Sequence, residues 1–265
     1  MLNITPDSFS DGGNFLSLGH AIEHAERMLA DGADVIEVGG ESTRPGAAPV
    51  AANAEIARVV PVVEEIVKRW PSARVAIDTV KSEVAAAAIG AGATIVNDVS
   101  ALRLDDAIAG VCAASECTLV LMHSRGDVAE MAGYAHAGYP GGDVIGAIIA
   151  ELRPAVELAL AAGVRRHRIV LDPGLGFSKR PAQSVQALAH LPRLAELGFD
   201  VMIGASRKRF IGELTGVKKA AERGAGTIGA NVVALSLGAT WFRVHDVREN
   251  RHALDAAAAI LEARA

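Results

Sequence analysis

Three side chains of the kind that bind a flat heterocycle each stand at the end of a short apolar run. Asp78 and Asp172 directly follow such runs, and Asn97 closes another. A carboxylate accepts hydrogen bonds from adjacent N–H groups, and an amide both donates and accepts them. If the fold brings the three side chains together, they suit the 2-amino-4-oxo edge of a heterocycle.

A second set of residues supplies cations. Arg243 and His245 are two residues apart, so on a strand they share one face. Lys208 and Arg44 follow two other apolar runs. Cationic side chains that converge from separate runs predict a site for a compact anionic group such as a phosphate.

Metal and nucleophile chemistry is indicated less strongly. His123 and His245 lack the short spacing of a zinc site. Asn3, Asp7 and Asp11 would suit Mg²⁺ once phosphate oxygens complete its coordination. The chain has no GxSxG segment, which argues against a serine nucleophile of the hydrolase type.

Short runs rich in Val and Ile alternate with longer amphipathic runs. The predicted strands are Leu2–Ile4, Val35–Val38, Arg74–Ile77, Thr94–Asn97, Thr118–Met122, Arg168–Leu171, Val201–Ile203 and Trp241–Val244. The predicted helices are Ser17–Ala30, Ala54–Arg69, Ser82–Ile89, Asp105–Ala114, Asp143–Ala162, Ala182–Leu197, Ile228–Leu237 and Arg248–Glu262. Gly163 and Gly238 directly follow two of these helices, where a left-handed residue commonly ends a helix.

This alternation predicts a single-domain α/β protein, a (β/α)8 TIM barrel over residues 1–265. In such a barrel the chemistry lies at the carboxyl ends of the strands, which is where the candidate residues stand. A doubly wound open sheet is the alternative, but it usually has fewer strand–helix units in this length. No GxGxxG or GxxxxGKS/T segment follows a predicted strand, so the common nucleotide-binding motifs are missing.

The composition is that of a folded soluble protein. The chain has 265 residues, 51% of them apolar, and a net charge of 26 − 31 = −5. With this charge and only 4% aromatic residues, we expect no nucleic-acid partner. Cys112 and Cys117 are too few for a disulfide framework and are expected in the core. We expect a cytoplasmic protein with no membrane partner, because no leader or bilayer-length apolar run is present.

Five segments, in order along the chain, resemble the signature segments of the dihydropteroate synthases, a family of pterin-binding TIM barrels. They are Asn3–Gly13, Gly39–Gly46, Asp172–Phe177, Ser206–Lys208 and Arg243–Val247. The resemblance extends over essentially the whole chain. It implies that 4-aminobenzoate displaces diphosphate from 6-hydroxymethyl-7,8-dihydropterin diphosphate to give 7,8-dihydropteroate in folate biosynthesis.

The resemblance also implies roles for particular residues. The pterin would bind Asp78, Asn97, Asp172 and Lys208. The diphosphate would bind Asn3, Arg243 and His245, with Mg²⁺ at Asn3. The aminobenzoate would bind Thr43, Arg44, Pro45, Phe177, Ser206 and Lys208, and the catalytic residues would be Asp78, Asp11, Lys208 and Asn3.

The mechanism implied in this way is dissociative. Mg²⁺, Arg243 and His245 would neutralise the departing diphosphate. Asp78 and Asp11 would stabilise the pterin cation that is left, so no protein nucleophile is needed. The loop Ser8–Gly13 would close over the site.

The same resemblance carries three further expectations. Sulfonamides, which mimic aminobenzoate, are expected to inhibit, although a sulfonamide-insensitive variant is a possible alternative. A homodimer through the last helices is expected. The first strand is expected to be short, since Met1 stands almost directly before Asn3, so barrel closure is weakest at that seam.

Two rival functions stay open. A methyltetrahydrofolate-dependent methyltransferase could share the Asp/Asn/Asp pocket, but it needs no diphosphate clamp such as Arg243 and His245. A non-catalytic paralogue could bind pterin or serve as a subunit.

Overall fold

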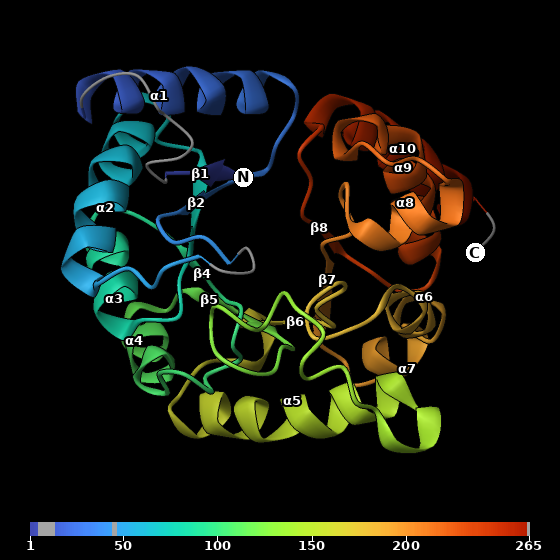
Figure 1. The fold of residues 1–265 in the computed structure, drawn as a ribbon. Helices are drawn as coiled ribbons and strands as arrows, with labels where there is room; N and C mark the ends of the chain where they lie inside the picture. The colour runs from blue at the N-terminus through green and yellow to red at the C-terminus, as the bar shows by residue number, and fades with distance from the viewer. Residues whose placement is uncertain (5–13, 44–46, 264–265) are drawn as a thin grey trace.

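The computed structural model describes residues 1–4, 14–43 and 47–263, in which strands and helices alternate (Figure 1). The strands are β1 (Leu2–Asn3), β2 (Val35–Gly39), β3 (Arg74–Asp78), β4 (Ile95–Asp98), β5 (Thr118–Met122), β6 (Ile169–Asp172), β7 (Asp200–Ile203) and β8 (Trp241–Phe242). The helices are α1 (Asn14–Ala30), α2 (Ala52–Arg69), α3 (Ser82–Gly90), α4 (Ala107–Ser115), α5 (Val144–Ala161), α6 (Pro181–Ala189), α7 (Pro192–Ala195), α8 (Arg209–Thr215), α9 (Gly224–Ser236) and α10 (Val247–Glu262).

The strands form one curled sheet whose order follows the chain. Each strand from β1 to β7 pairs in parallel with the next one. The helices lie around the outside of the sheet (Figure 1). This arrangement confirms the predicted α/β class and places the carboxyl ends of the strands on one edge.

The predicted closure of the sheet into a barrel is not seen within the described residues. No strand pairing joins β8 to β1 there. Each of these two strands is only two residues long, so few backbone groups are available to pair across the junction. A cavity of about 810 Å³ lies at this seam, lined among others by Val35, Arg74 and Trp241.

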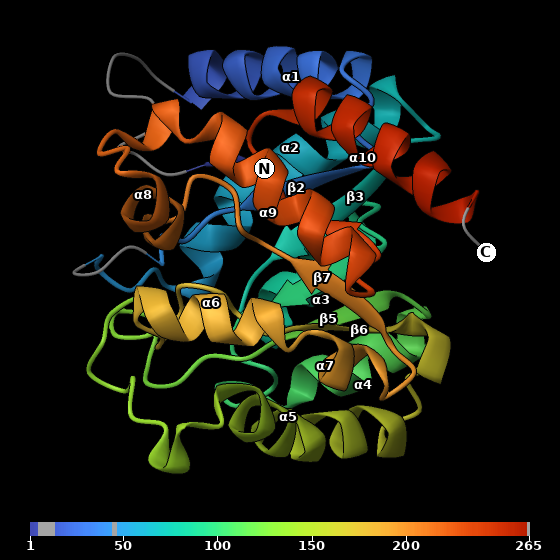
Figure 2. The ribbon, with the colours of Figure 1, turned by 90° about the vertical axis from the view of Figure 1, so that its right-hand side faces the viewer.

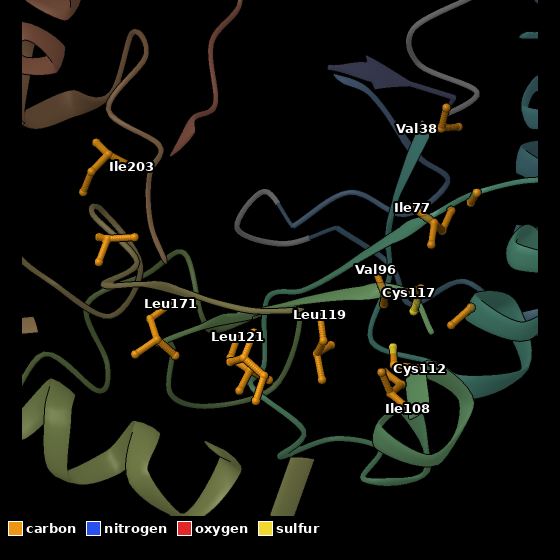
Figure 3. Close-up of a cluster of buried hydrophobic side chains, with 14 of the residues drawn as sticks. Val38, Ile77, Val96, Ile108, Cys112, Cys117, Leu119, Leu121, Leu171 and Ile203 are labelled. Atoms are coloured by element: carbon orange, nitrogen blue, oxygen red, sulfur yellow. The ribbon is translucent and has the colours of Figure 1, made fainter. Parts of the chain in front are cut away.

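Alternating side chains divide the core into two layers. Val38, Ile77, Leu119 and Leu121 lie between the sheet and the helices (Figure 3). A smaller cluster on the concave side of the sheet contains Ala76, Ile95, Val120, Val170 and Met202. The period of two within each strand produces both layers from almost continuous apolar runs.

Several predicted boundaries need correction. The predicted helix Ala182–Leu197 is two helices, α6 and α7, because Pro192 lacks the N–H that would continue the first helix. Helix α8 was not predicted; it is short and ends at Gly216, whose φ is +74°. Helix α9 begins at Gly224, before the predicted start.

The predicted helix ends are confirmed at Gly163 and Gly238, whose φ values are +102° and +100°. An L side chain is strained in this region of φ, so glycine can turn the chain there at little cost. Cys112 and Cys117 are free and buried, as predicted. No helix in the part of the chain that the structure describes is long and apolar enough to span a membrane.

Truncating Leu121 should destabilise the fold strongly. Leu121 is fully buried between β5 and the helices, so Leu121→Ala leaves a cavity and should cost about 2–5 kcal/mol in unfolding free energy, measured by urea denaturation. Leu104→Ala is the control, because Leu104 is 39% exposed and its loss should cost less than about 0.5 kcal/mol. Equal losses in the two variants would contradict this description of the core.

Candidate active site

The three residues predicted to bind a heterocycle lie at the carboxyl ends of their strands. Asp78 and Asn97 are register partners on β3 and β4, and Asp172 ends β6. Asn97 and Asp172 are each only 2% exposed. The Oδ1 atom of Asn97 is buried and has no hydrogen-bond partner among the residues that the structure describes. An unpartnered buried acceptor is costly, and a ligand N–H group would satisfy it.

Arg243 lies between two carboxylates that come from different strands. Its Nη2 atom donates to Asp78 Oδ2 at 2.8 Å, and its Nε atom donates to Glu37 Oε1 at 2.7 Å. Asn97 Nδ2 donates to the other oxygen of Glu37 at 3.1 Å. One guanidinium therefore connects the end of β8 with β2 and β3.

This charge cluster shifts the pKa of each acid in a different direction. Burial and the neighbouring charge of Glu37 raise the pKa of Asp78 to about 7, against the attraction of Arg243. Burial alone would raise the pKa of Glu37, but the charge and hydrogen bond of Arg243 hold it below its usual value. Asp78 is therefore poised to gain charge when a cationic or N–H-rich ligand arrives.

Lys208 lies near Asp172 and above an aromatic ring. Its ammonium donates to the carbonyl of Leu175 and stands 4.6 Å from the centre of the Phe177 ring. Burial lowers the pKa of Lys208 to about 8, while Asp172 opposes that shift. Gly176 approaches the Lys208 stem closely: a Cβ there would lie 3.2 Å from Lys208 Cδ, and the φ of Gly176 is +79°.

His245 is held by Ser206. The Ser206 hydroxyl lies 2.9 Å from His245 Nδ1 and accepts a hydrogen bond from the His245 backbone N–H at 3.1 Å. Burial, with nearby positive charges, lowers the pKa of His245 to about 4. The imidazole is therefore neutral near pH 7. Because Nδ1 faces the Ser206 hydroxyl, the ring can donate a hydrogen bond to an anion only through Nε2.

A cavity of about 1240 Å³ brings most of the predicted residues together. It is lined by Asn3, Thr43, Asp78, Phe177, Ser206, Lys208, Arg243 and His245, among others. Asn97 instead lines the seam cavity, which shares Arg243 and Met1 with this one. Asp172 lines neither cavity, but it is buried close enough to Lys208 to interact with its charge. The predicted residues Asp7, Asp11, Arg44 and Pro45, and the loop Ser8–Gly13, lie outside the described residues.

One donor at the cavity edge, the amide oxygen of Asn3, is of the kind that Mg²⁺ accepts from a protein. Residues 1–4, 14–43 and 47–263 contain no group of three or more His, Cys, Asp and Glu side chains that could hold a metal. Asn3 is exposed at the cavity and offers one amide oxygen. Mg²⁺ accepts a single such ligand when phosphate oxygens and waters complete its shell.

A buried ion cluster beside the β2 loop was missed by the sequence interpretation. Lys81 Nζ lies 2.6 Å from Glu55 Oε2 and 2.8 Å from Glu41 Oε2. Glu41 also accepts from the backbone N–H of Val50 at 2.7 Å. The cluster ties α2 and the residues after β3 to the loop that carries Thr43. Glu37 was missed as well, although a glutamate inside an otherwise apolar strand is a signal that could have found it.

Comparison with known proteins assigns the family. The family described as "Pterin binding enzyme" matches residues 1–245. The chain belongs to this family, and within it to the dihydropteroate synthases. A dihydropteroate synthase of Mycobacterium leprae is 43% identical over 99% of this chain and 93% of its own length. One of Streptococcus pyogenes serotype M3 is 41% identical over 95% of this chain and 90% of its own length.

Solved structures of dihydropteroate synthases agree with this assignment. One from Clostridium difficile with pteroic acid has a TM-score of 0.90 and 39% identity, covering 98% of this chain and 94% of its own. One from Xanthomonas albilineans with 7,8-dihydropteroate has a TM-score of 0.86 and 39% identity, covering 98% and 91%. As a member of the dihydropteroate synthases, the chain is an enzyme of the transferase class.

Removing Arg243 should destabilise the protein in a pH-dependent way. In Arg243→Met, Glu37 and Asp78 lose their shared cation and their pKa values rise. The cost should be about 3 kcal/mol at pH 8 and should shrink toward pH 5, where protonation removes the unpaired buried charge. Urea denaturation across this pH range measures it.

The matched control for this prediction is Arg251→Met. The partners of Arg251, Asp34 and Asp255, have side chains that are 79% and 59% exposed. This variant should lose less than about 1 kcal/mol and show no trend with pH. A pH-independent loss in Arg243→Met would contradict the charge balance described above.

Proposed function

We propose that this chain condenses 6-hydroxymethyl-7,8-dihydropterin diphosphate with 4-aminobenzoate to 7,8-dihydropteroate and diphosphate, in folate biosynthesis. The observation that carries the proposal is the Oδ1 of Asn97, unpartnered among the described residues, next to Asp78, which shares its cavity with Arg243 and His245. These groups complement an N–H-rich heterocycle joined to an anion. Solved relatives from Xanthomonas albilineans with 4-aminobenzoic acid and with 7,8-dihydropteroate support one reactant and the product of this reaction.

We propose a dissociative reaction in which the chain's residues supply only charge and position. Arg243 exchanges part of its contact with Glu37 and Asp78 for the diphosphate, and His245 donates to it through Nε2. The cation that develops on the pterin then lies beside Asp78 as an opposite charge and favours the ionised form of this carboxyl group. The same proposal includes Asp11 on the loop Ser8–Gly13, which would stabilise this cation together with Asp78.

Binding of the second substrate needs an apolar face and a cation. The Phe177 ring offers the face, and Lys208 and Ser206 lie at its edge beside Thr43. Arg44 and Pro45 would complete this part of the site. Once the C–O bond to diphosphate has broken, the amine nitrogen attacks the exocyclic carbon of the pterin cation, a C–N bond forms, and the amine releases one proton to solvent.

Mg²⁺ belongs to this proposal through Asn3. When bound, it would neutralise charge on the leaving diphosphate. Asn3 would hold it by its amide oxygen, and the phosphate oxygens and waters would supply the other ligands.

We also propose that the curled sheet is that of a (β/α)8 barrel whose weakest junction is β8 to β1. The support is the sequential parallel order of the strands and the reach of Arg243, beyond β8, to Glu37 on β2. A reducing, cytoplasmic location is proposed from the free, buried thiols of Cys112 and Cys117.

The direct test is turnover by the purified protein. The pterin diphosphate, Mg²⁺ and 4-aminobenzoate should together yield dihydropteroate and diphosphate, and a sulfonamide should inhibit. A relative from Yersinia pestis solved with a sulfonamide drug supports the last point. Absence of product would refute the proposal. Pterin binding without product would point to a non-catalytic paralogue, and methyl transfer from methyltetrahydrofolate would point to a methyltransferase.

Two substitutions test the charges of Asp78 and Lys208, which lie next to the reacting groups. Asp78→Asn and Lys208→Ala should each lower kcat/KM by about 100-fold or more, because each removes a charge next to the reacting groups. Lys68→Ala is the control, since the Lys68 side chain is 80% exposed on α2. Unchanged kcat/KM in both site variants would show that the residues have been assigned wrongly.

We propose that two copies pair through α9 and α10, which lie side by side (Figure 2). Val233 on α9 is 51% exposed and Ile260 on α10 is 65% exposed, although both are large apolar residues. Sedimentation should give a dimer for the wild type and a monomer for Val233→Glu combined with Ile260→Glu. A wild-type monomer would refute the pairing.

A further inference from the structure

Lys179 is fully buried and has no part in the reaction as described above. It follows the β6 loop and is only 1% exposed. Its Nζ atom lies 2.8 Å from His123 Nδ1, 3.0 Å from the Phe177 carbonyl and 3.2 Å from the Gly174 carbonyl. The His123 carbonyl lies 3.5 Å away as a fourth acceptor. Burial lowers the pKa of Lys179 well below its usual value, while the charge of Asp172 opposes that shift and favours the ammonium form.

His123 links Lys179 to a carboxylate near the surface. His123 Nε2 lies 3.1 Å from Glu151 Oε2 on α5. Arg125 Nε donates to the same oxygen at 2.9 Å. Burial, followed by the charge of Lys179, lowers the pKa of His123 to about 4, so its ring is neutral near pH 7. A neutral ring that faces a carboxylate places its proton on Nε2, which leaves Nδ1 to accept from Lys179.

The segment that Lys179 binds has little regular structure of its own. Gly174, Gly176 and Ser178 have φ values of +66°, +79° and +47°. Such a segment depends on contacts from outside to hold one conformation. Lys179 binds a carbonyl near each end of it, at Gly174 and Phe177.

Fixing this segment also fixes an aromatic face of the active site. Phe177 packs against a cluster of buried side chains, Val80, Val99, Met122 and Met131, and its ring lies under the Lys208 ammonium. The backbone carbonyl of Phe177 is the group that Lys179 holds. A shift of that carbonyl would move the ring in the cavity.

We propose that Lys179 is a positioning residue for the second substrate: its ammonium, oriented by His123 and Glu151, holds residues 174–178 so that Phe177 presents its ring to the aminobenzoate. This inference rests on the proposed function. A buried ammonium is costly to desolvate, and an apolar side chain of similar volume often replaces such a group without loss of the fold. Holding the loop is therefore the benefit of keeping a lysine here.

Steady-state kinetics of Lys179→Met test the inference. The KM for 4-aminobenzoate should rise about tenfold, equivalent to ~1.4 kcal/mol, while the KM for the pterin diphosphate stays within about twofold. Leu152→Val is the control for a general loss of packing, because Leu152 is a buried apolar residue of α5 in the main hydrophobic core. It should lower Tm, and the KM for 4-aminobenzoate should not rise relative to the KM for the pterin diphosphate.

A surface variant keeps the test decisive if Lys179→Met fails to fold. Glu151→Gln removes the carboxylate at the outer end of the hydrogen-bonded series Lys179, His123 and Glu151. The Glu151 side chain is 41% exposed. It should raise the KM for aminobenzoate about threefold, a smaller rise than in Lys179→Met. Glu157→Gln, on the exposed side of the same helix, should leave both KM values unchanged.

Hydrogen exchange separates failure of this inference from failure of the proposed function. The amides of residues 175–178 should exchange about tenfold faster in Lys179→Met than in the wild type, and they should not do so in Leu152→Val. This measurement needs no turnover, so it holds even if the wild type makes no product. Unchanged exchange in that segment, or an equal rise in both KM values, would overturn the inference.

Discussion

The guanidinium of Arg243 lies between two buried carboxylates, those of Glu37 and Asp78, and the rest of the active site depends on that arrangement. A single positive charge cannot fully neutralise two acids at this depth. The pKa of Asp78 therefore rises to about 7, mainly through burial and then the charge of Glu37, while Glu37 stays ionised. The site thus holds a carboxyl group that gains charge readily and a cation that an anionic substrate can recruit.

Two lysines, the partly exposed Lys81 and the fully buried Lys179, hold loops that line the same cavity. Lys81 joins Glu41 and Glu55 beside the loop after β2, and Lys179 holds the loop after β6. In both places a charged side chain fixes the backbone near the proposed aminobenzoate site, and Lys179 also lines the cavity that contains Asp78 and interacts electrostatically with Asp172. In the proposed function the pterin binds mainly at strand ends and the aminobenzoate mainly at loops, which need such anchors.

Much of this architecture could be predicted from the sequence, because its signals are local. The strand runs and the glycines after helices predicted the α/β order, and Asp78, Asn97, Asp172, Arg243 and His245 could be proposed as site residues because each stands at a strand end. Closure of the barrel could not be predicted, since it depends on how β1 and β8 meet. Lys179 was missed because its role comes from contacts with residues far away in the chain. Glu37 could have been noticed as a glutamate inside an apolar strand, but its partner Arg243 is distant in the sequence.

A direct titration of the Asp78 carboxyl group is the closest test of the arrangement in which Glu37 and Asp78 share Arg243. Its ¹³C signal can be followed by NMR against pH and assigned by its loss in Asp78→Asn. The account predicts a midpoint near pH 7 in the wild type and a higher one in Arg243→Met, because the favourable charge is then gone. A midpoint near the ordinary value of about 4 would contradict the shared-cation arrangement.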